Sequence, residues 1–153
     1  MQRTYIRWMI WQDLPEVIEL AKQNPELQWS EQELTDRAKQ RDTIAMIAER
    51  NDQIVGFTMY ELHPNRLHIT NMVVDQKYRR EGIGRTIMEK LISKLDAERR
   101  NRITLLTSES NLIFQQFLRA MGFRAVQIVR NTNSEDMYSM RYAINSEVTS
   151  LKE

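Results

Sequence analysis

The segment from Val73 to Arg85 combines an apolar strand end, a basic loop and paired glycines, in the order VVDQKYRREGIGR. A helix that begins at the glycines presents amide hydrogens that have no intrahelical acceptor, and these attract an anion. Glycine also lets the backbone approach a phosphate without an intervening Cβ. Three arginines add positive charge beside these amides: Arg79, Arg80 and Arg85. The segment therefore predicts a binding site for a diphosphate group.

Two other phosphate-binding motifs do not match this segment. No Gly-Lys-Ser/Thr follows the glycines, as a Walker loop requires, and the third glycine of the dinucleotide fingerprint is missing. The alternative without a phosphate is that the glycines serve only a tight turn and the arginines form a solvated face. The chain would then be a basic-patch binding domain that uses no cofactor.

Composition restricts the chemistry further. The 153 residues suggest one domain with a sizeable core, and 22 basic against 21 acidic residues give a net charge of +1. That balance argues against a protein built mainly to hold nucleic acid. Without cysteine there is no disulfide, thiolate nucleophile or Cys-based zinc site. Only two histidines are present, His63 and His68, so we expect no metal site.

The distribution of apolar residues predicts where the protein is found. No apolar run approaches the ~18 residues needed to span a membrane. The first residues, MQRTY, lack the long apolar stretch of a signal peptide. The sequence therefore predicts a cytoplasmic protein without a membrane partner.

Hydrophobic periodicity and turn signals predict seven strands and four helices. The strands are expected at residues 5–11, 43–48, 54–62, 67–74, 103–107, 125–129 and 137–144. The helices are expected from residue 13, from residue 30, over 82–99 and over 111–121. Asp13 with Glu16, and Ser30 with Glu33, match the capping box at the first two helix starts.

The order of these elements is β-α-α-β-β-β-α-β-α-β-β. It predicts an α/β (mixed α+β) fold, with a central mixed, mostly antiparallel sheet of about seven strands and helices on both faces. We expect a single domain over residues 1–144 and a flexible C-terminal tail over 145–153.

Two motifs in the chain resemble those of the GNAT family of acyl-CoA-dependent N-acetyltransferases. The family signature Gln/Arg-x-x-Gly-x-Gly/Ala is met by Arg79, Gly82 and Gly84. The family's Ser-Asn…Gly-Phe helix segment is matched by the following residues: Ser110, Asn111, Phe117, Gly122 and Phe123. The resemblance extends over residues 5–143, and the element order is that of the family.

Within the family, the chain looks like bacterial ribosomal-protein N-alanine acetyltransferases and related N-terminal acetyltransferases. The similarity lies in residues 71–74, in Ser110-Asn111 and in Glu135-Asp136 before the last strand. It implies transfer of the acetyl group of acetyl-CoA to a primary amine, either a protein N-terminal α-amine or a small molecule. The alternative within this fold is a non-catalytic acyl-CoA-binding or regulatory module. A monomer or a homodimer is expected.

The resemblance also implies which residues contact acetyl-CoA. Backbone groups of residues 72–74 would pair with the pantetheine arm, the loop amides would hold the pyrophosphate, and Asn111 would lie near the thiol end. The implied cofactor-binding residues are Met72, Val73, Val74, Arg79, Arg80, Glu81, Gly82, Ile83, Gly84, Arg85, Thr86, Asn111 and Phe117.

The chain departs from the family where related enzymes carry an acid and a base. Leu106 stands where they place a Glu or His base, and Leu118 where they place a Tyr acid. His68 is the candidate base, because an imidazole titrates near pH ~6.5. Tyr138 is a second candidate catalytic residue, and Tyr60 an alternative to it. The alternative for His68 is a surface histidine without a catalytic role, and the alternative for Tyr138 and Tyr60 is a purely structural role.

Overall fold

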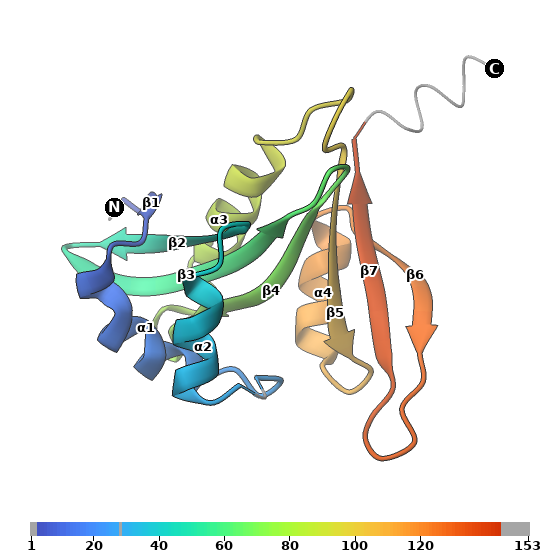
Figure 1. The fold of residues 1–153 in the computed structure, drawn as a ribbon, viewed down its shortest axis with the longest axis horizontal. Coiled ribbons are helices and arrows are strands. Elements are labelled where there is room, and N and C mark those ends of the chain that lie inside the picture. The colour runs from blue at the N-terminus through green and yellow to red at the C-terminus, as the bar shows by residue number, and fades with distance from the viewer. Residues whose placement is uncertain (1–2, 28, 145–153) are drawn as a thin grey trace. The chain divides into compact units, whose positions relative to one another are not determined.

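The computed structural model describes residues 3–27 and 29–144, so the predicted tail at 145–153 lies outside it (Figure 1). The described residues form seven strands, four α-helices and two 3-10 turns. In chain order they are β1 (Tyr5–Trp8), a 3-10 turn (Trp11–Asp13), α1 (Leu14–Ala21), α2 (Glu31–Ala38), β2 (Thr43–Arg50), β3 (Gln53–Leu62), β4 (Leu67–Val74), a 3-10 turn (Gln76–Tyr78), α3 (Ile83–Ile92), β5 (Arg102–Ser108), α4 (Leu112–Ala120), β6 (Arg124–Val129) and β7 (Met137–Ala143).

The predicted fold class and element order are confirmed. The strand order in the sheet is β1-β2-β3-β4-β5-β7-β6, with β4 and β5 parallel and the flanking pairs β1–β2, β2–β3, β5–β7 and β6–β7 antiparallel. The chain divides into two compact units: Met1–Leu62 with Thr70–Ser93, and His63–Ile69 with the remainder from Lys94. Strand β4 contributes to both, and a single domain over 1–144 stays a prediction.

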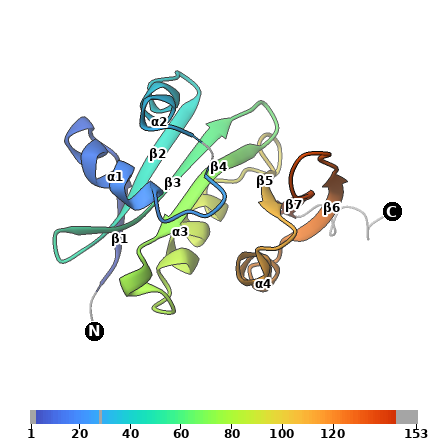
Figure 2. The same cartoon turned by 90° about the horizontal axis from the view of Figure 1, so that it is seen from below.

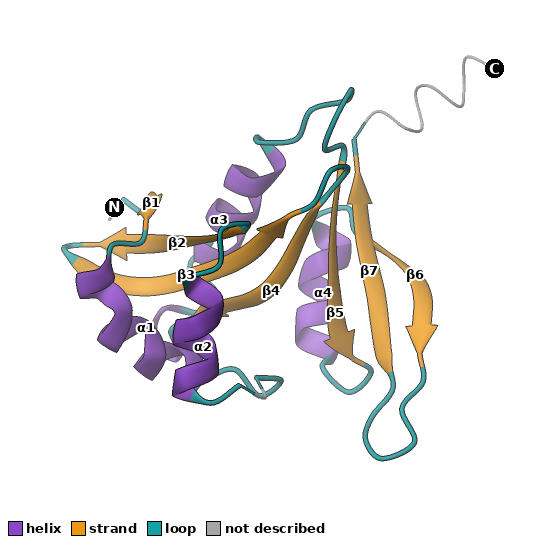
Figure 3. Ribbon diagram, in the orientation of Figure 1, coloured by secondary structure: helices purple, strands orange, loops and turns teal. Residues whose placement is uncertain are grey.

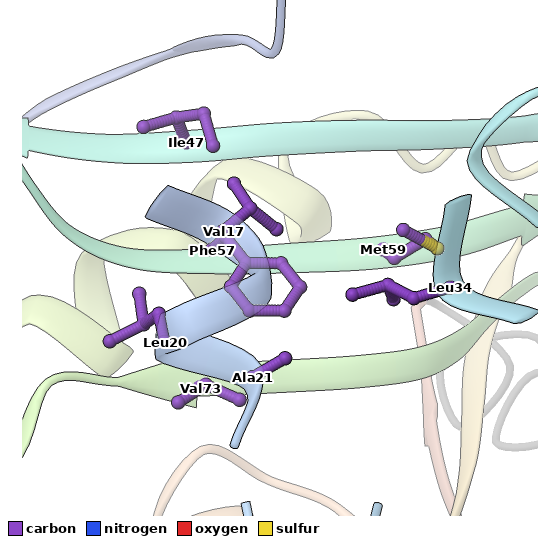
Figure 4. Packing of buried hydrophobic residues seen from close by; sticks show 8 residues of the cluster. All are labelled: Val17, Leu20, Ala21, Leu34, Ile47, Phe57, Met59 and Val73. Atoms are coloured by element: carbon purple, nitrogen blue, oxygen red, sulfur yellow. The ribbon is translucent and has the colours of Figure 1, made fainter. Parts of the chain in front are cut away.

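In the first unit, helices cover both faces of the strands (Figure 2). Helices α1 and α2 pack on one face around Phe57, which is fully buried (Figure 4). The other members of this cluster are Val17, Leu20, Ala21, Leu34, Ile47, Met59 and Val73. Each large apolar side chain buried here stabilises the fold by ~1.5–3 kcal/mol.

Helix α3 covers the opposite face of the same strands. Its buried residues Ile83 and Ile87 pack against Ala48 and Val55. Gly56 is required on this face, because a Cβ there would stand 2.9 Å from the carbonyl oxygen of Val73. The first unit therefore holds the end of β4 tightly against β3.

Helix α3 ends at Ile92, so its predicted extension to residue 99 is wrong. The Ser93 hydroxyl donates to the carbonyl of Lys90, and the carboxylate of Asp96 accepts from the amide of Glu98. Such local side-chain hydrogen bonds offer the backbone an alternative to the helix.

One of the two predicted capping boxes is confirmed. Ser30 accepts from the amide of Glu33, whose side chain accepts from the amide of Ser30. Asp13 makes no such cap. Its carboxylate accepts instead from the amide of Ile10 and from both terminal nitrogens of Arg7, at 2.8 and 3.0 Å. This guanidinium holds the pKa of the Asp13 carboxyl below its usual range.

The second unit is a small sheet with α4 on one face (Figure 3). The register pairs His68 with Thr104, Thr104 with Arg141 and Thr107 with Tyr138. Paired residues share a face, and neighbours along a strand alternate between faces. The face toward α4 carries the buried apolar residues Ile103, Leu105 and Met140, together with Leu118 and Phe123 from α4 and its end.

Candidate active site

The loop between β4 and α3 has the backbone geometry of an anion site. Arg80 and Gly82 both adopt left-handed conformations, with φ of 66° and 81°. The first bond of α3 runs from the amide of Thr86 to the carbonyl of Gly82, at 3.0 Å. The amides of residues 83–85 therefore precede the intrahelical ladder and are oriented toward the loop. Left-handed residues in such a turn form a concavity of amides that suits a phosphate.

The space and charge at this loop fit a pyrophosphate. Apart from its chain neighbours and the backbone of its own helix, no described atom lies within 4 Å of where a Cβ on Gly82 would stand, so a phosphate could approach the backbone there. Arg79, Arg80 and Arg85 are all exposed. Because the side chain of Ile83 is buried, a ligand could contact only the backbone of this residue. The Thr86 hydroxyl donates to the carbonyl of Gly82, so it stabilises the helix start.

Arg50 anchors this loop, and no motif or spacing in the sequence indicated this role. It is the last residue of β2 and is only 7% exposed. Its guanidinium donates to the carboxylate of Glu81 and to the hydroxyl of Thr4, and lies 5.9 Å from the centre of the Tyr78 ring. The ion pair with Arg50 also neutralises the carboxylate of Glu81, the one acidic residue between Arg79 and Arg85.

Replacing Arg50 with methionine is expected to weaken acetyl-CoA binding about fivefold, or ~1 kcal/mol, because the loop loses its anchor and Glu81 regains a free charge. Calorimetry with acetyl-CoA measures the change. Arg7→Met is the matched control, since Arg7 also binds two carboxylates in the first unit, Asp13 and Glu49. Equal affinities in the two folded variants would remove Arg50 from this role.

The end of β4 supplies the backbone predicted to pair with a pantetheine arm. Val73 is 4% exposed, and Met72 and Val74 on either side are half-buried. The preceding Asn71 is buried and accepts from the side-chain amide of Asn24 at 2.9 Å. Its own amide nitrogen has no hydrogen-bond partner among the residues that the structure describes.

The two candidate catalytic residues of the second unit are not brought together. Nδ1 of His68 lies 2.8 Å from the hydroxyl of Thr104, on the face opposite α4. Tyr138 pairs with Thr107 and shares the face that packs against α4. A substrate on one face of this sheet cannot contact both side chains.

The leucines at the family's acid and base positions differ in environment. Leu106 lies on the face of His68 and is 43% exposed, whereas Leu118 is fully buried in α4. Tyr60 is also buried, and this burial raises the pKa of its hydroxyl to about 12. Tyr60 is therefore unsuited to accept a proton near neutral pH.

Asn111 and Phe117 have structural contacts of their own. The Asn111 side chain caps α4 by accepting from the amide of Phe114 at 3.3 Å. The rings of Phe114 and Phe117 stack with their centres 6.0 Å apart. A role of either predicted residue in binding the cofactor stays a prediction.

A polar cluster that sequence spacing did not indicate lies where β5 ends. Ser108 donates to the carboxylate of Glu135, and its hydroxyl lies 3.1 Å from that of Ser110. Hydrogen bonds from Ser108 and then Ser110 lower the pKa of Glu135. The cluster therefore keeps an ionised carboxylate in the loop between β6 and β7.

Residues 3–27 and 29–144 contain neither a metal-binding cluster nor a membrane-spanning helix. No group of three or more His, Cys, Asp or Glu residues there could hold a metal ion. Nor is any of the described helices long and apolar enough to cross a membrane.

The chain is similar to known acetyltransferases. It is 24% identical over 119 residues to the [ribosomal protein bS18]-alanine N-acetyltransferase of Escherichia coli K12, a match covering 78% of this chain and 80% of that protein. The crystal structure of the E. coli ribosomal-protein-S18-alanine N-acetyltransferase superposes with a TM-score of 0.82 at 22% identity, covering 93% and 94% of the two chains.

Two more distant structures share the fold. Ard1 from Thermoplasma volcanium gives a TM-score of 0.81 at 18% identity, covering 92% of this chain and 97% of that one. Arabidopsis thaliana NAA60 in complex with acetyl-CoA gives a TM-score of 0.80 at 14% identity, covering 93% of this chain and 100% of that one. The family model of the acetyltransferase (GNAT) family matches residues 7–123, so this chain belongs to that family.

Proposed function

We propose that this protein transfers the acetyl group of acetyl-CoA to a primary amine. The observation that carries the proposal is the start of α3, where left-handed Arg80 and Gly82 precede helix amides within the family motif. When bound, acetyl-CoA supplies an activated acetyl thioester. The loop amides would hold its pyrophosphate, and backbone groups of Met72–Val74 would orient the pantetheine arm.

The chain's part in the chemistry is to position the reactants and to remove a proton from the amine. Holding thioester and amine together can supply up to ~7–11 kcal/mol in favourable cases. Only the neutral amine attacks, so a base must accept its proton. We assign this role to His68. If Nδ1 donates to Thr104, Nε2 carries the lone pair that accepts a proton. The departing thiol has a pKa of ~8.5, so its departure needs less acid catalysis than the amine needs base catalysis.

The α-amine of a protein N-terminus is the acceptor we favour, with a small-molecule amine as the second possibility. The support is the similarity to an enzyme named for the alanine of ribosomal protein bS18. A ribosomal acceptor would place the reaction in the cytoplasm.

A two-step assay tests this function. Calorimetry should detect acetyl-CoA binding, and a thiol-release assay with N-terminal peptides and small amines should detect turnover on at least one acceptor. Binding without turnover would favour the non-catalytic module, motivated by Leu106 and Leu118. Failure to bind acetyl-CoA at all would leave a basic-patch domain without a cofactor.

A further inference from the structure

The sheet of the second unit has one face that α4 does not cover. Alternation along the strands places His68, Thr104 and Leu106 on this face. Arg141 is paired directly with Thr104, and Arg124 directly with Arg141. One row across β4, β5, β7 and β6 therefore reads His68, Thr104, Arg141 and Arg124. Arg102 lies on the same face, two residues from Thr104 along β5.

Arginines are the charged residues that the described strands of the second unit place on this face. No Asp or Glu occupies its positions on the described strands of the second unit, because β5, β6 and β7 contain none. Arg124 and Arg141 are both exposed, and neither forms an ion pair or a side-chain hydrogen bond within the described residues. By the same alternation Ser108 lies on this face, so the carboxylate of Glu135 that it binds lies where β5 ends, four residues along the strand from Thr104.

Like charges directly opposite each other on neighbouring strands destabilise a sheet. Arg124 and Arg141 make such a pair, which an anion between them would turn into a favourable arrangement. A guanidinium binds a carboxylate through two parallel hydrogen bonds, so two arginines can bind one carboxylate from both sides.

We propose that the row formed by Arg141 and Arg124 binds a carboxylate of the acceptor, which makes acidic peptides the preferred substrates. The inference rests on the proposed acetyl transfer. His68, the proposed base, stands in the same row of the second unit. The net charge of +1 favours a small acidic ligand over nucleic acid.

The test uses two hexapeptides with a free N-terminal alanine that differ only by Glu or Gln at the second position. We expect kcat/KM for the Glu peptide to exceed that for the Gln peptide at least tenfold in the parent protein. In Arg141→Gln, and in Arg124→Gln, the ratio should fall below about threefold, with acetyl-CoA affinity unchanged. The preference should also shrink with added salt, because exposed charges are screened.

Arg119→Gln is the matched control, since Arg119 is an exposed arginine on α4, which covers the other face. It should keep the full preference. A parent that acetylates both peptides equally well, or a preference unchanged in both row variants, would overturn the proposal while acetyl transfer stands.

Calorimetry separates this failure from failure of the proposed function. If no acceptor is acetylated, the row still predicts that the Glu peptide binds at least tenfold more tightly than the Gln peptide and that Arg141→Gln removes the difference. Equal binding of the two peptides would then reject the row as well. A third outcome is that the parent binds a single-stranded oligonucleotide, that both row variants lose this binding, and that the two peptides bind equally. The ligand of the row would then be nucleic acid and not an acidic acceptor.

Discussion

Replacing His68 with alanine is expected to lower kcat for acetyl transfer about 100-fold, the lower end of what a positioned general base contributes. The parent rate should rise with pH through an inflection where the ring loses its proton, because only the neutral ring accepts the amine's proton. The variant should lose that inflection. Its affinity for acetyl-CoA should not change, because the proposed cofactor contacts lie elsewhere on β4 and in the loop after it.

His63→Ala is the control for this experiment. The ring of His63 lies 6.3 Å from that of His68, so the control keeps one imidazole and removes its neighbour. It should retain both the rate and the pH profile. If solvent takes the proton instead, the parent rate would climb toward the pKa of the acceptor, ~8 for an α-amine, and His68→Ala would change little.

The exposed position of Leu106 allows the missing carboxylate to be restored. Leu106→Glu in the His68→Ala variant places a carboxylate on the same face of the sheet, and we expect partial recovery of turnover. Leu118→Tyr is a poorer restoration, because Leu118 is fully buried and the larger side chain would have to displace core atoms.

Gly82→Val is expected to weaken acetyl-CoA binding at least tenfold, or ~1.4 kcal/mol. Gly82 has φ of +81°, a conformation that a β-branched residue adopts only at a cost. Among the residues that the structure describes, the space beside Gly82 is open, so a valine there would obstruct the ligand and strain the loop rather than disturb the core. Calorimetry with acetyl-CoA and thermal unfolding of the same samples measure both effects.

A matched control separates ligand binding from backbone strain. Gly122→Ala also places a side chain on a left-handed residue, with φ of +100°, and its Cβ would lie 3.1 Å from the Tyr142 ring. It should lower stability and leave acetyl-CoA affinity unchanged. Gly84 has no positive φ, so Gly84→Val tests the approach of the phosphates with less strain. Parent-like affinity in both folded loop variants would refute the pyrophosphate site.

Local interactions account for the features that could be predicted from the sequence. The strand, basic loop and glycines of residues 73–85 predicted the anion site, because a helix start depends on residues only a few positions apart. The Ser30–Glu33 capping box was predicted for the same reason. Amphipathic periodicity predicted all four helices and the element order, since each element needs an apolar face for the core.

Contacts between side chains of different elements could only come from the tertiary structure. Asp13 binds Arg7 rather than capping its helix, because the β1 arginine competes for the carboxylate. Arg50 reaches Glu81 across 31 positions, a contact that no spacing rule indicates.

The register between strands decided the rest of the candidate site. A shift of one residue moves every side chain to the other face of a sheet, and sequence spacing does not fix that choice between distant strands. The pairing of Thr104 with Arg141, and of Arg141 with Arg124, created the cationic row. The same register placed His68 and Tyr138 on opposite faces, although both were candidates for one reaction. The sequence by itself therefore determined the family, the element order and the glycine-containing start of α3, whereas the tertiary structure decided which side chains share a face of the second unit's sheet.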